Sequence, residues 1–419
     1  MLLSACLPEP ADLCSTLRRR SAEVPLGVVR TRPPREWQAA ATGFCSHLVQ
    51  LGVARSLCAR QLGPELASAS VMVAIPAKDE AVRIGPTMAA VKRSADHVPS
   101  GLGVVVFANN CVDGTDAAVV RKASELNLPI LLLQGELHEI HRHAGWARRI
   151  AMDLADRLCG PDGVILTTDA DTSVSPAWAG ALAAQLAGSA DLVFGDFEVD
   201  SPSAAVAALE AGPFWRTERL YASLHDELRH LCDQIVGRQP LGGPRPHYTE
   251  AGASIGIRAD LYRRIGGLPP MAKSEDRALA RAAELAGARI RYIAGATVAT
   301  SGRLIGRAKG GFAETVCRRL LESDPPVDER LRPTAGLATM WANALRAVRP
   351  WQWTAGSEEL TGLSPAVRHA LMENEWHRAL VETPLRVSAL RAELCSLVRL
   401  LEEQVYPAFA DWKHEAAGP

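Results

Sequence analysis

The part of the chain that starts at Val71 alternates short apolar runs with alanine-rich stretches of helical spacing. This alternation is typical of βα units whose strands form a mostly parallel sheet. The expected strands share runs of aliphatic residues and lie at 71–76, 103–108, 129–133, 163–168, 191–199, 289–293 and 296–300. The expected helices lie at about 83–97, 114–126, 144–158, 176–187 and 213–235. The carboxyl ends of such strands share one rim, so polar residues that directly follow a strand are the first candidates for ligand contact.

The chain has 419 residues, more than one ordinary domain, and we divide it into three parts. We expect an N-terminal helical extension over residues 1–68, an α/β core over 69–324 and a C-terminal helical region over 325–419. The 46 basic residues balance the 47 acidic ones, so the composition indicates no nucleic-acid partner. No apolar run approaches the roughly 18 residues needed to cross a bilayer, and we expect no transmembrane segment.

The nine cysteines are scattered, odd in number and never form a Cys-x-x-Cys pair. This usage favours free thiols in a reducing cytoplasm. The opening run Leu2 to Cys6 resembles a lipoprotein cleavage box, but only five residues precede Cys6, too few for the apolar part of an export signal. We therefore expect a cytoplasmic protein.

One apolar stripe stands out in the C-terminal region. Its members recur at alternating steps of three and four: Val387, Leu390, Leu394, Leu397 and Leu401. This spacing places them on one face of a helix. Two heptads are short for a coiled coil, so we favour packing within the chain and keep homodimerisation as the alternative.

Acidic and amide side chains follow the first two expected strands. The first strand ends before Asp79 and Glu80, and the second ends before Asn109, Asn110 and Asp113. Side chains of this kind can pair with the edge of a nucleobase. They can equally cap the helices that start there, because carboxylates at a helix N-terminus are stabilised by the helix dipole.

Asp169 and Asp171 directly follow the fourth expected strand. Two carboxylates one residue apart at the end of a buried strand repel one another unless a metal ion or a cationic side chain compensates them. Mg²⁺ or Mn²⁺ prefers such oxygen ligands and would act as a Lewis acid on a phosphate leaving group. The alternative is a solvated turn that caps the helix near Pro176.

In their order along the chain, these motifs resemble the family 2 glycosyltransferases, which have the GT-A fold, a Rossmann-like α/β fold of nucleotide-sugar transferases. The shared pattern is a strand ending in Pro-x-x-[Asn/Asp]-Glu, a second strand ending in a polar turn, an Asp-x-Asp, and a Glu-Asp pair. The last element lies within residues 252–293, where Glu275 and Asp276 are in register with the family pattern. The resemblance covers about residues 70–310.

The resemblance implies an inverting, hexosyltransferase-like enzyme that moves a sugar from a nucleotide-diphosphate sugar to an acceptor hydroxyl. Its implied donor site consists of residues that follow core strands: Pro76, Ala77, Asp79, Glu80, Asn109, Asp113 and Asp169. Asp171 would bind Mg²⁺ or Mn²⁺ directly, with Asp169 close to the metal. Asp276 would be the general base, and Glu275 would orient the acceptor or the loop.

The chain departs from the family pattern after the last core strand. Many GT-A enzymes offer a histidine there as a metal ligand, whereas this chain has Arg303 in that region. We therefore expect Arg303, with Arg307 and Lys309, to approach the diphosphate, because guanidinium pairs well with phosphate. A solvated basic face is the alternative.

A histidine-rich loop precedes the helix that carries Arg148. The corresponding family region approaches the donor diphosphate, which implies a contact from His143 or Arg148. His138, His141 and His143 could also suggest zinc, but their spacing is not a recognised zinc motif and no fourth ligand lies nearby.

Two other functions remain as alternatives. A nucleotidyltransferase would normally carry a glycine-rich, basic loop after the first strand, and AIPAKDEAVRIG is not such a loop. A non-catalytic sugar-nucleotide-binding scaffold would not need both carboxylate motifs. The sequence does not distinguish a sugar, a lipid-linked and a small-molecule acceptor.

Overall fold

Four of the apolar runs form neighbouring parallel strands, as the alternating pattern predicts. The computed structural model describes residues 37–64, 69–160, 162–200, 206–207, 211–303, 306, 311–348 and 385–417. Within them, nine strands form one sheet in the order β1-β4-β3-β2-β5-β8-β7-β9-β6. The strands are β1 (Ala54–Leu62), β2 (Val71–Ala77), β3 (Leu102–Asn109), β4 (Ile130–Leu137), β5 (Val164–Thr167), β6 (Thr172–Val174), β7 (Leu192–Asp200), β8 (Ile255–Arg258) and β9 (Ile290–Ser301).

Strands β1, β8 and β6 run against the other strands, so the sheet is mixed and mostly parallel. The expected α/β class is confirmed. The runs 289–293 and 296–300 form one strand, β9, with a register shift against β7. Strands β1, β6 and β8 lie outside the expected apolar runs, because β1 alternates exposed and buried residues, β6 has only three residues and β8 only four. Part of the expected N-terminal extension therefore belongs to the sheet.

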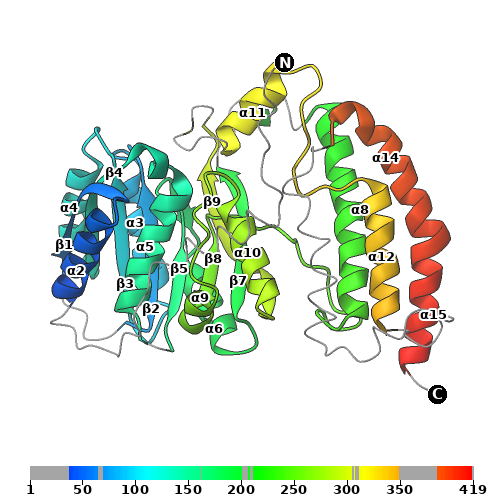
Figure 1. Ribbon diagram of the computed structural model, residues 1–419, viewed down its shortest axis with the longest axis horizontal. Coiled ribbons are helices and arrows are strands. Elements are labelled where there is room, and N and C mark those ends of the chain that lie inside the picture. The colour runs from blue at the N-terminus through cyan, green and yellow to red at the C-terminus, as the bar shows by residue number, and fades with distance from the viewer. Residues whose placement is uncertain are drawn as a thin grey trace, which may run out of the picture.

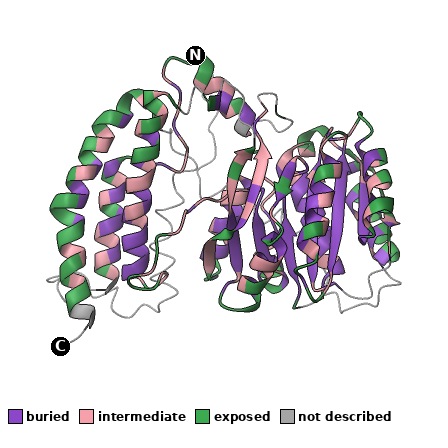
Figure 2. Ribbon diagram, turned by 180° about the vertical axis from the view of Figure 1, so that it is seen from behind, coloured by how far each residue is buried: buried purple, intermediate pink, exposed green. Residues whose placement is uncertain are grey.

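Helices cover both faces of the sheet, whose strands are largely buried (Figure 2). On one face, α2 (Trp37–Gln50), α5 (Ala144–Leu158), α9 (Ala259–Arg264) and α10 (Glu275–Leu285) contribute buried apolar side chains such as Ile150 and Leu279. On the other face, α3 (Ile84–Ala95), α4 (Thr115–Leu126) and α6 (Trp178–Ala187) contribute side chains such as Ile84 and Trp178. Burying each large aliphatic side chain contributes about 1.5–3 kcal/mol, so these two layers hold the rim loops on a rigid frame.

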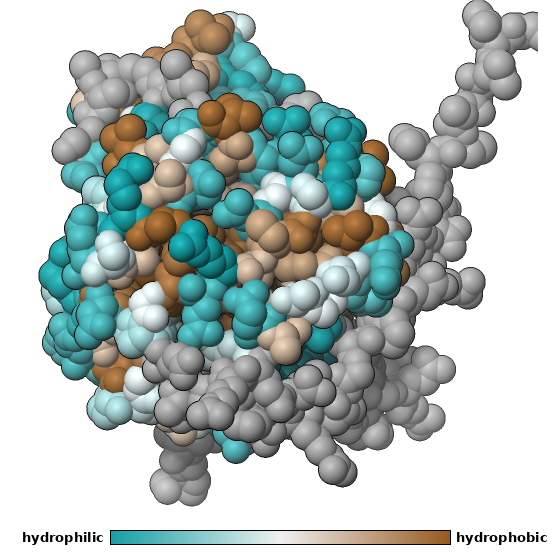
Figure 3. Space-filling model, turned by 90° about the vertical axis from the view of Figure 1, so that its left-hand side faces the viewer, coloured by the Kyte–Doolittle hydropathy of each residue, from teal (hydrophilic) through white to brown (hydrophobic). Residues whose placement is uncertain are grey.

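The edge strand β1 is protected against pairing with another chain. The Gln38 side chain, from α2, donates to Ala59 O at 2.7 Å and accepts from Gln61 N at 3.3 Å. Arg55 and Arg60 are exposed on the same strand, and charged edge residues disfavour strand addition. Figure 3 views the molecule from this end and shows hydrophilic residues around the hydrophobic ones.

Long helices form a second unit beside the sheet (Figure 1). They are α8 (Pro213–Ile235), α12 (Thr334–Val348), α14 (Val387–Leu400), the π turn η5 (Leu401–Val405) and α15 (Tyr406–Ala417), and α11 (Phe312–Leu321) lies between the units. Leu390, Leu397 and Leu401 of the apolar stripe are buried among side chains of α8 and α12. The stripe therefore packs within the chain, as we favoured, and α8 packs with the C-terminal helices.

No helix in the described part of the chain is long and apolar enough to cross a membrane. The seven described cysteines are free thiols, as their scattered positions predict. The cleavage-box resemblance at Cys6 lies outside the described residues, as do Arg307 and Lys309.

Candidate active site

The polar loops gather where the strand order reverses, between β2 and β5. Strands β3 and β4 lie on one side of β2, and β5 lies on the other. Ligands of open α/β sheets bind beyond the carboxyl ends of the strands at such a switch point. Ala74 O accepts from Thr168 N, so the backbone polar positions of Ala74, and of Pro76 two residues further on, point toward β5. The pairing of β2 with β5 ends at Ala74. Pro76, which has no N–H to donate, is tolerated there because it lies beyond the last pair.

Asp79 and Asp113 tie the loop after β2 to the loop after β3. Asp79 Oδ1 accepts from Val112 N at 2.8 Å, and Asp113 Oδ2 accepts from Ala81 N at 2.9 Å. Both carboxylates therefore fix the shape of the first two rim loops. Carboxylate oxygens of Asp79 and Asp113 also lie within 4.8 Å of Cys111 Sγ, a grouping of atoms that could hold a metal ion. The hydrogen bonds to the backbone already give the two acids a structural role that requires no ion.

The rim holds strained backbone, which accumulates at functional sites. Five described non-glycine residues have a left-handed backbone: Asp79, Asn110, Asn127, Tyr248 and Ser274. Asp79 and Asn110 lie in the first two rim loops, and Ser274 directly precedes the Glu-Asp pair. The expected donor-site residue Asn109 is buried at the end of β3, next to this strained turn.

The loop after β5 carries the two aspartates of the Asp-x-Asp motif. The Thr87 hydroxyl, from α3, donates to Ala170 O at 2.9 Å and so fixes the turn between Asp169 and Asp171. Burial and the neighbouring Asp169 raise the pKa of Asp171 to about 6. Burial and the nearby carboxylate therefore both disfavour a negative charge on Asp171, and Arg303 offsets part of this effect.

Arg303 joins the acids on the two sides of the switch point. Strand β6 pairs with the end of β9, Thr172 opposite Thr300, and this pairing carries Arg303 to the Asp-x-Asp loop. Arg303 Nη2 lies 3.1 Å from Asp171 Oδ2, and Nη1 donates to Glu80 Oε2 at 3.0 Å. Glu80 is only 5% exposed, so the guanidinium compensates a buried carboxylate as well as Asp171.

Glu275 and Asp276 begin helix α10. Asp276 Oδ2 accepts from Gly252 N at 3.0 Å, and Oδ1 accepts from Arg277 N at 2.8 Å. Burial and the adjacent Glu275 raise the pKa of Asp276 to about 6. The carboxylate is thus held in one orientation and is ionised at neutral pH.

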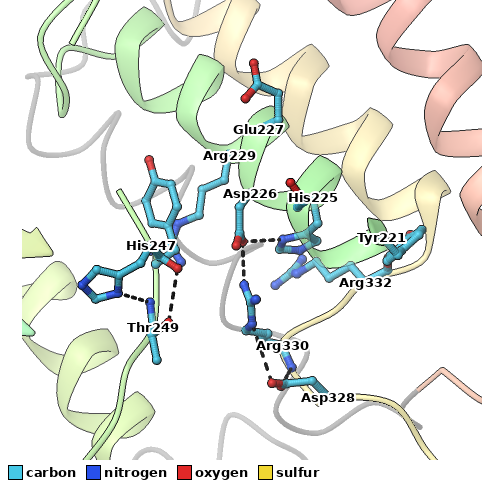
Figure 4. A network of polar contacts seen from close by, with 12 residues as sticks. Tyr221, His225, Asp226, Glu227, Arg229, His247, Thr249, Asp328, Arg330 and Arg332 are labelled. Carbon is cyan, nitrogen blue, oxygen red and sulfur yellow. Dashed lines mark hydrogen bonds and ion pairs between the residues drawn. The ribbon is translucent and has the colours of Figure 1, made fainter. Parts of the chain in front are cut away.

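A row of ion pairs leads from α10 to the helical unit. Arg277 Nη2 donates to Asp328 Oδ1 at 2.8 Å, and Arg330 Nη1 donates to Asp226 Oδ1 of α8 at 2.5 Å. Asp328 also accepts from Arg330 N at 2.9 Å (Figure 4). The start of α10 is therefore fixed from the helical side as well as from the sheet.

Arg148 of α5 lies between the Asp-x-Asp loop and the Glu-Asp pair. Its side chain is buried, with donors 2.6 Å from Asp169 Oδ1 and 3.1 Å from Glu275 Oε1. Two further bonds reach Thr167 Oγ1 at 3.1 Å and Gly252 O at 2.7 Å. Burial opposes its positive charge, but Asp169 and Glu275 raise the pKa of Arg148 above its usual range.

The histidine loop does not gather its rings into a metal-binding group of the described residues. His143 caps α5 by accepting from Trp146 N at 3.4 Å, and His141 packs edge-on against the Trp146 ring. Burial lowers the pKa of both His141 and His143. His143 lies close to Glu275, whose negative charge raises the pKa of His143 and offsets part of the effect of burial.

The structure thus brings together residues expected from separate motifs: Glu80, Asp169, Asp171, Glu275, Asp276, Arg148 and Arg303. Pro76, Ala77, Asp79, Asn109, Asp113 and His143 lie in or beside the adjoining rim loops. Sequence reasoning missed Thr87, Thr167 and Gly252. Thr167 and Gly252 belong to motif segments, whereas no local signal points to Thr87.

No protein-family model matches the chain. No curated protein matches it. The mannosyltransferase PcManGT from Pyrobaculum calidifontis, in complex with GDP-Man and Mn²⁺, is 16% identical, with 92% of this chain and 90% of that chain covered and a TM-score of 0.45. TarS from S. aureus, in complex with UDP-GlcNAc, is 16% identical, with 81% and 92% covered and a TM-score of 0.41.

Glucosyl-3-phosphoglycerate synthase from Mycobacterium tuberculosis, in complex with Mn²⁺, UDP and phosphoglyceric acid, is 16% identical, with 71% of this chain and 86% of that chain covered and a TM-score of 0.36.

Proposed function

We propose that this protein is a glycosyltransferase that moves a sugar from a nucleotide-diphosphate sugar to an acceptor hydroxyl with the help of a divalent cation. One observation carries the proposal. Glu80 and Asp171, from the two sides of the switch point, meet at Arg303, and Arg148 connects Asp169 of the same Asp-x-Asp loop to Glu275 of the Glu-Asp pair that begins α10. Donor binding and a carboxylate base are thus available in one connected site.

The acids of the Asp-x-Asp loop fit a divalent cation. Burial, Asp169 and Glu80 all raise the pKa of Asp171, although Arg303 lowers it, so the site still favours added positive charge. Asp171 and Asp169 would hold Mg²⁺ or Mn²⁺, both of which prefer carboxylate oxygens. When bound, the ion supplies Lewis-acid stabilisation of the diphosphate leaving group.

The remaining residues divide into donor-side and acceptor-side roles. Pro76, Ala77, Asp79, Glu80, Asn109 and Asp113 would line the nucleoside side. Arg303, and His143 at the start of α5, would contact the diphosphate. Asp276 would accept the proton of the acceptor hydroxyl as that oxygen attacks the anomeric carbon, which gives inversion by direct displacement. Glu275 would orient the loop that carries Asp276.

A donor panel tests this proposal. Thermal shifts would be measured for nucleotide-diphosphate sugars, nucleoside triphosphates and free sugars, with Mn²⁺ or with a chelator. We expect stabilisation by at least one nucleotide-diphosphate sugar only when Mn²⁺ is present, followed by slow release of nucleoside diphosphate. Pyrophosphate release from a triphosphate would instead identify a nucleotidyltransferase. Donor binding without any turnover, with acceptors present, would identify a scaffold.

A further inference from the structure

The guanidinium of Arg148 is surrounded by protein on every side that the structure describes. The side chain is 5% exposed, and its three nitrogens donate to two carboxylates, a hydroxyl and a carbonyl. An arginine has five N–H donors in a fixed plane, so four of them are already directed at protein acceptors. A residue that binds the donor diphosphate would need to keep its donors available for that ligand.

We infer that Arg148 is a positioning residue, which sets the spacing between the donor-side Asp169 and the base Asp276 through Gly252. The inference rests on the proposed function and replaces the diphosphate contact expected from the sequence for this side chain. It also assigns Glu275 a role as a partner of Arg148.

Gly252 is the link between Arg148 and the base. Its carbonyl accepts from Arg148 Nη1 at 2.7 Å, and its N–H donates to Asp276 Oδ2 at 3.0 Å. Arg148 Nη2 meanwhile donates to Asp169 Oδ1 at 2.6 Å. A single buried side chain therefore contacts the Asp-x-Asp loop directly and the base through one residue. Movement of either loop changes the geometry at the other.

The close approach at Gly252 requires a glycine. A Cβ atom at this position would lie 2.7 Å from Arg148 Nη2 and 3.0 Å from its central carbon. The neighbouring atoms are held by four hydrogen bonds and have little freedom to move. Gly252→Ala would therefore displace the link without altering any charge in the site.

Lysine cannot reproduce the arrangement. Its ammonium is a point charge with three donors, whereas the acceptors of Arg148 surround a planar fork. Arg148→Lys keeps the positive charge between Asp169 and Glu275 but cannot bond all four acceptors at once. The two variants therefore separate the contribution of geometry from that of charge.

The test compares wild type, Arg148→Lys and Gly252→Ala, with Arg258→Lys and Gly295→Ala as matched controls. Arg258 is paired with Asp260 at the surface, and a Cβ at Gly295 would meet no atom within 4 Å. Each protein is assayed for donor Kd, kcat and KM at saturating manganese. Positioning predicts that kcat falls by about 100-fold or more in both site variants while donor Kd changes by less than about threefold. The controls should match wild type.

A loss that appears in donor Kd with kcat retained would overturn the inference in favour of a diphosphate contact. Unchanged kcat in a folded Gly252→Ala variant would also overturn it. A second readout does not need turnover: carbon-detected NMR follows the titration of Asp276 in wild type and Gly252→Ala. Loss of the Gly252 N–H bond should raise the Asp276 pKa. An unmoved titration would contradict the link even if wild type transferred no sugar, whereas an inactive wild type with a shifted titration would reject only the proposed function.

Discussion

Arg303 Nη2 lies 3.1 Å from Asp171 Oδ2, and Arg303 Nη1 donates to Glu80 Oε2 at 3.0 Å. Asp171 follows β5 and Glu80 follows β2, the two strands on either side of the switch point. Asp171 and Glu80 are 91 residues apart in the sequence, and both pair with the same guanidinium. Arg303 thus supplies part of the positive charge that the Asp-x-Asp pair needs.

Replacing Arg303 by alanine should destabilise the protein. The change leaves Glu80, which is 5% exposed, without its main cationic partner. An unpaired buried carboxylate costs on the order of 2–3 kcal/mol. Urea unfolding in the presence of a chelator would measure this loss. Arg289→Ala breaks an exposed pair with Asp191 and should cost less than about 1 kcal/mol. Equal losses in the two variants would contradict the account.

Activity should depend on pH through Asp276. Its folded-state pKa is raised to about 6 by burial and by Glu275, and a general base must be ionised to accept a proton. We therefore expect kcat, measured at saturating manganese and donor so that the titration of Asp171 does not contribute, to be constant above about pH 7 and to fall about tenfold per pH unit below about pH 6. The effect of Asp276 on stability has the opposite pH dependence. Because burial disfavours its ionised form, Asp276 lowers the free energy of unfolding above its folded-state pKa, and this loss fades as the pH falls through 6. Glu275→Gln should move the acid limb to lower pH, and an unmoved limb would exclude Asp276 as its source.

Much of the fold was readable because its signals are local. The apolar runs predict the bounds of β2, β3, β5 and β7 to within one residue, since each contains a continuous buried stretch such as residues 71–75, whereas β4 runs four residues beyond the expected 129–133. Residues that directly follow a strand, such as Asp169, could be placed on the rim for the same reason. The helix bounds followed from spacing, and α8 at Pro213–Ile235 matched the expected range.

The partners of the site residues were not readable, because they depend on pairing far along the chain. Arg303 reaches Asp171 only through the pairing of β6 with β9, and β6 is a three-residue strand without a sequence signature. Arg148 is separated by 104 residues from Gly252, and nothing in either segment announces the contact. A basic residue near a phosphate-binding motif looks the same in sequence whether it contacts the ligand or positions another residue.

The start of α5 should not tolerate a larger residue at Gly145. A Cβ there would lie 1.9 Å from Met271 O, in the segment that leads to Glu275. Gly145→Ala should therefore lower the unfolding free energy by about 1–3 kcal/mol through overpacking. Gly43→Ala, in an exposed position of α2 with no atom within 4 Å, should raise it by up to about 1 kcal/mol. Thermal unfolding of the two variants would show whether their signs differ.

The ion pairs of Figure 4 should support the base helix. Asp328→Asn removes the charge that pairs with Arg277, next to Asp276, and with Arg330. Arg277 and Arg330 hold the pKa of Asp328 below its usual range despite burial, so its carboxylate stabilises the fold above that pKa and loses this effect in acid. Because the Asp328 side chain is 37% exposed, solvent screens these pairs, and we expect a loss of about 0.5–1 kcal/mol at pH 7. Asp260→Asn, in an exposed pair, is the control, and a similar loss there would count against a special role for Asp328.

The most direct measurement is the manganese-dependent release of nucleoside diphosphate from a panel of nucleotide sugars, by wild type and by Asp171→Ala and Asp276→Asn. The account predicts release by wild type with at least one donor. Asp171→Ala should lose both release and manganese-dependent donor binding. Asp276→Asn should bind donor and metal but release product at least about 100-fold more slowly. Absence of donor binding and release across the whole panel, or full activity in Asp171→Ala, would contradict the account.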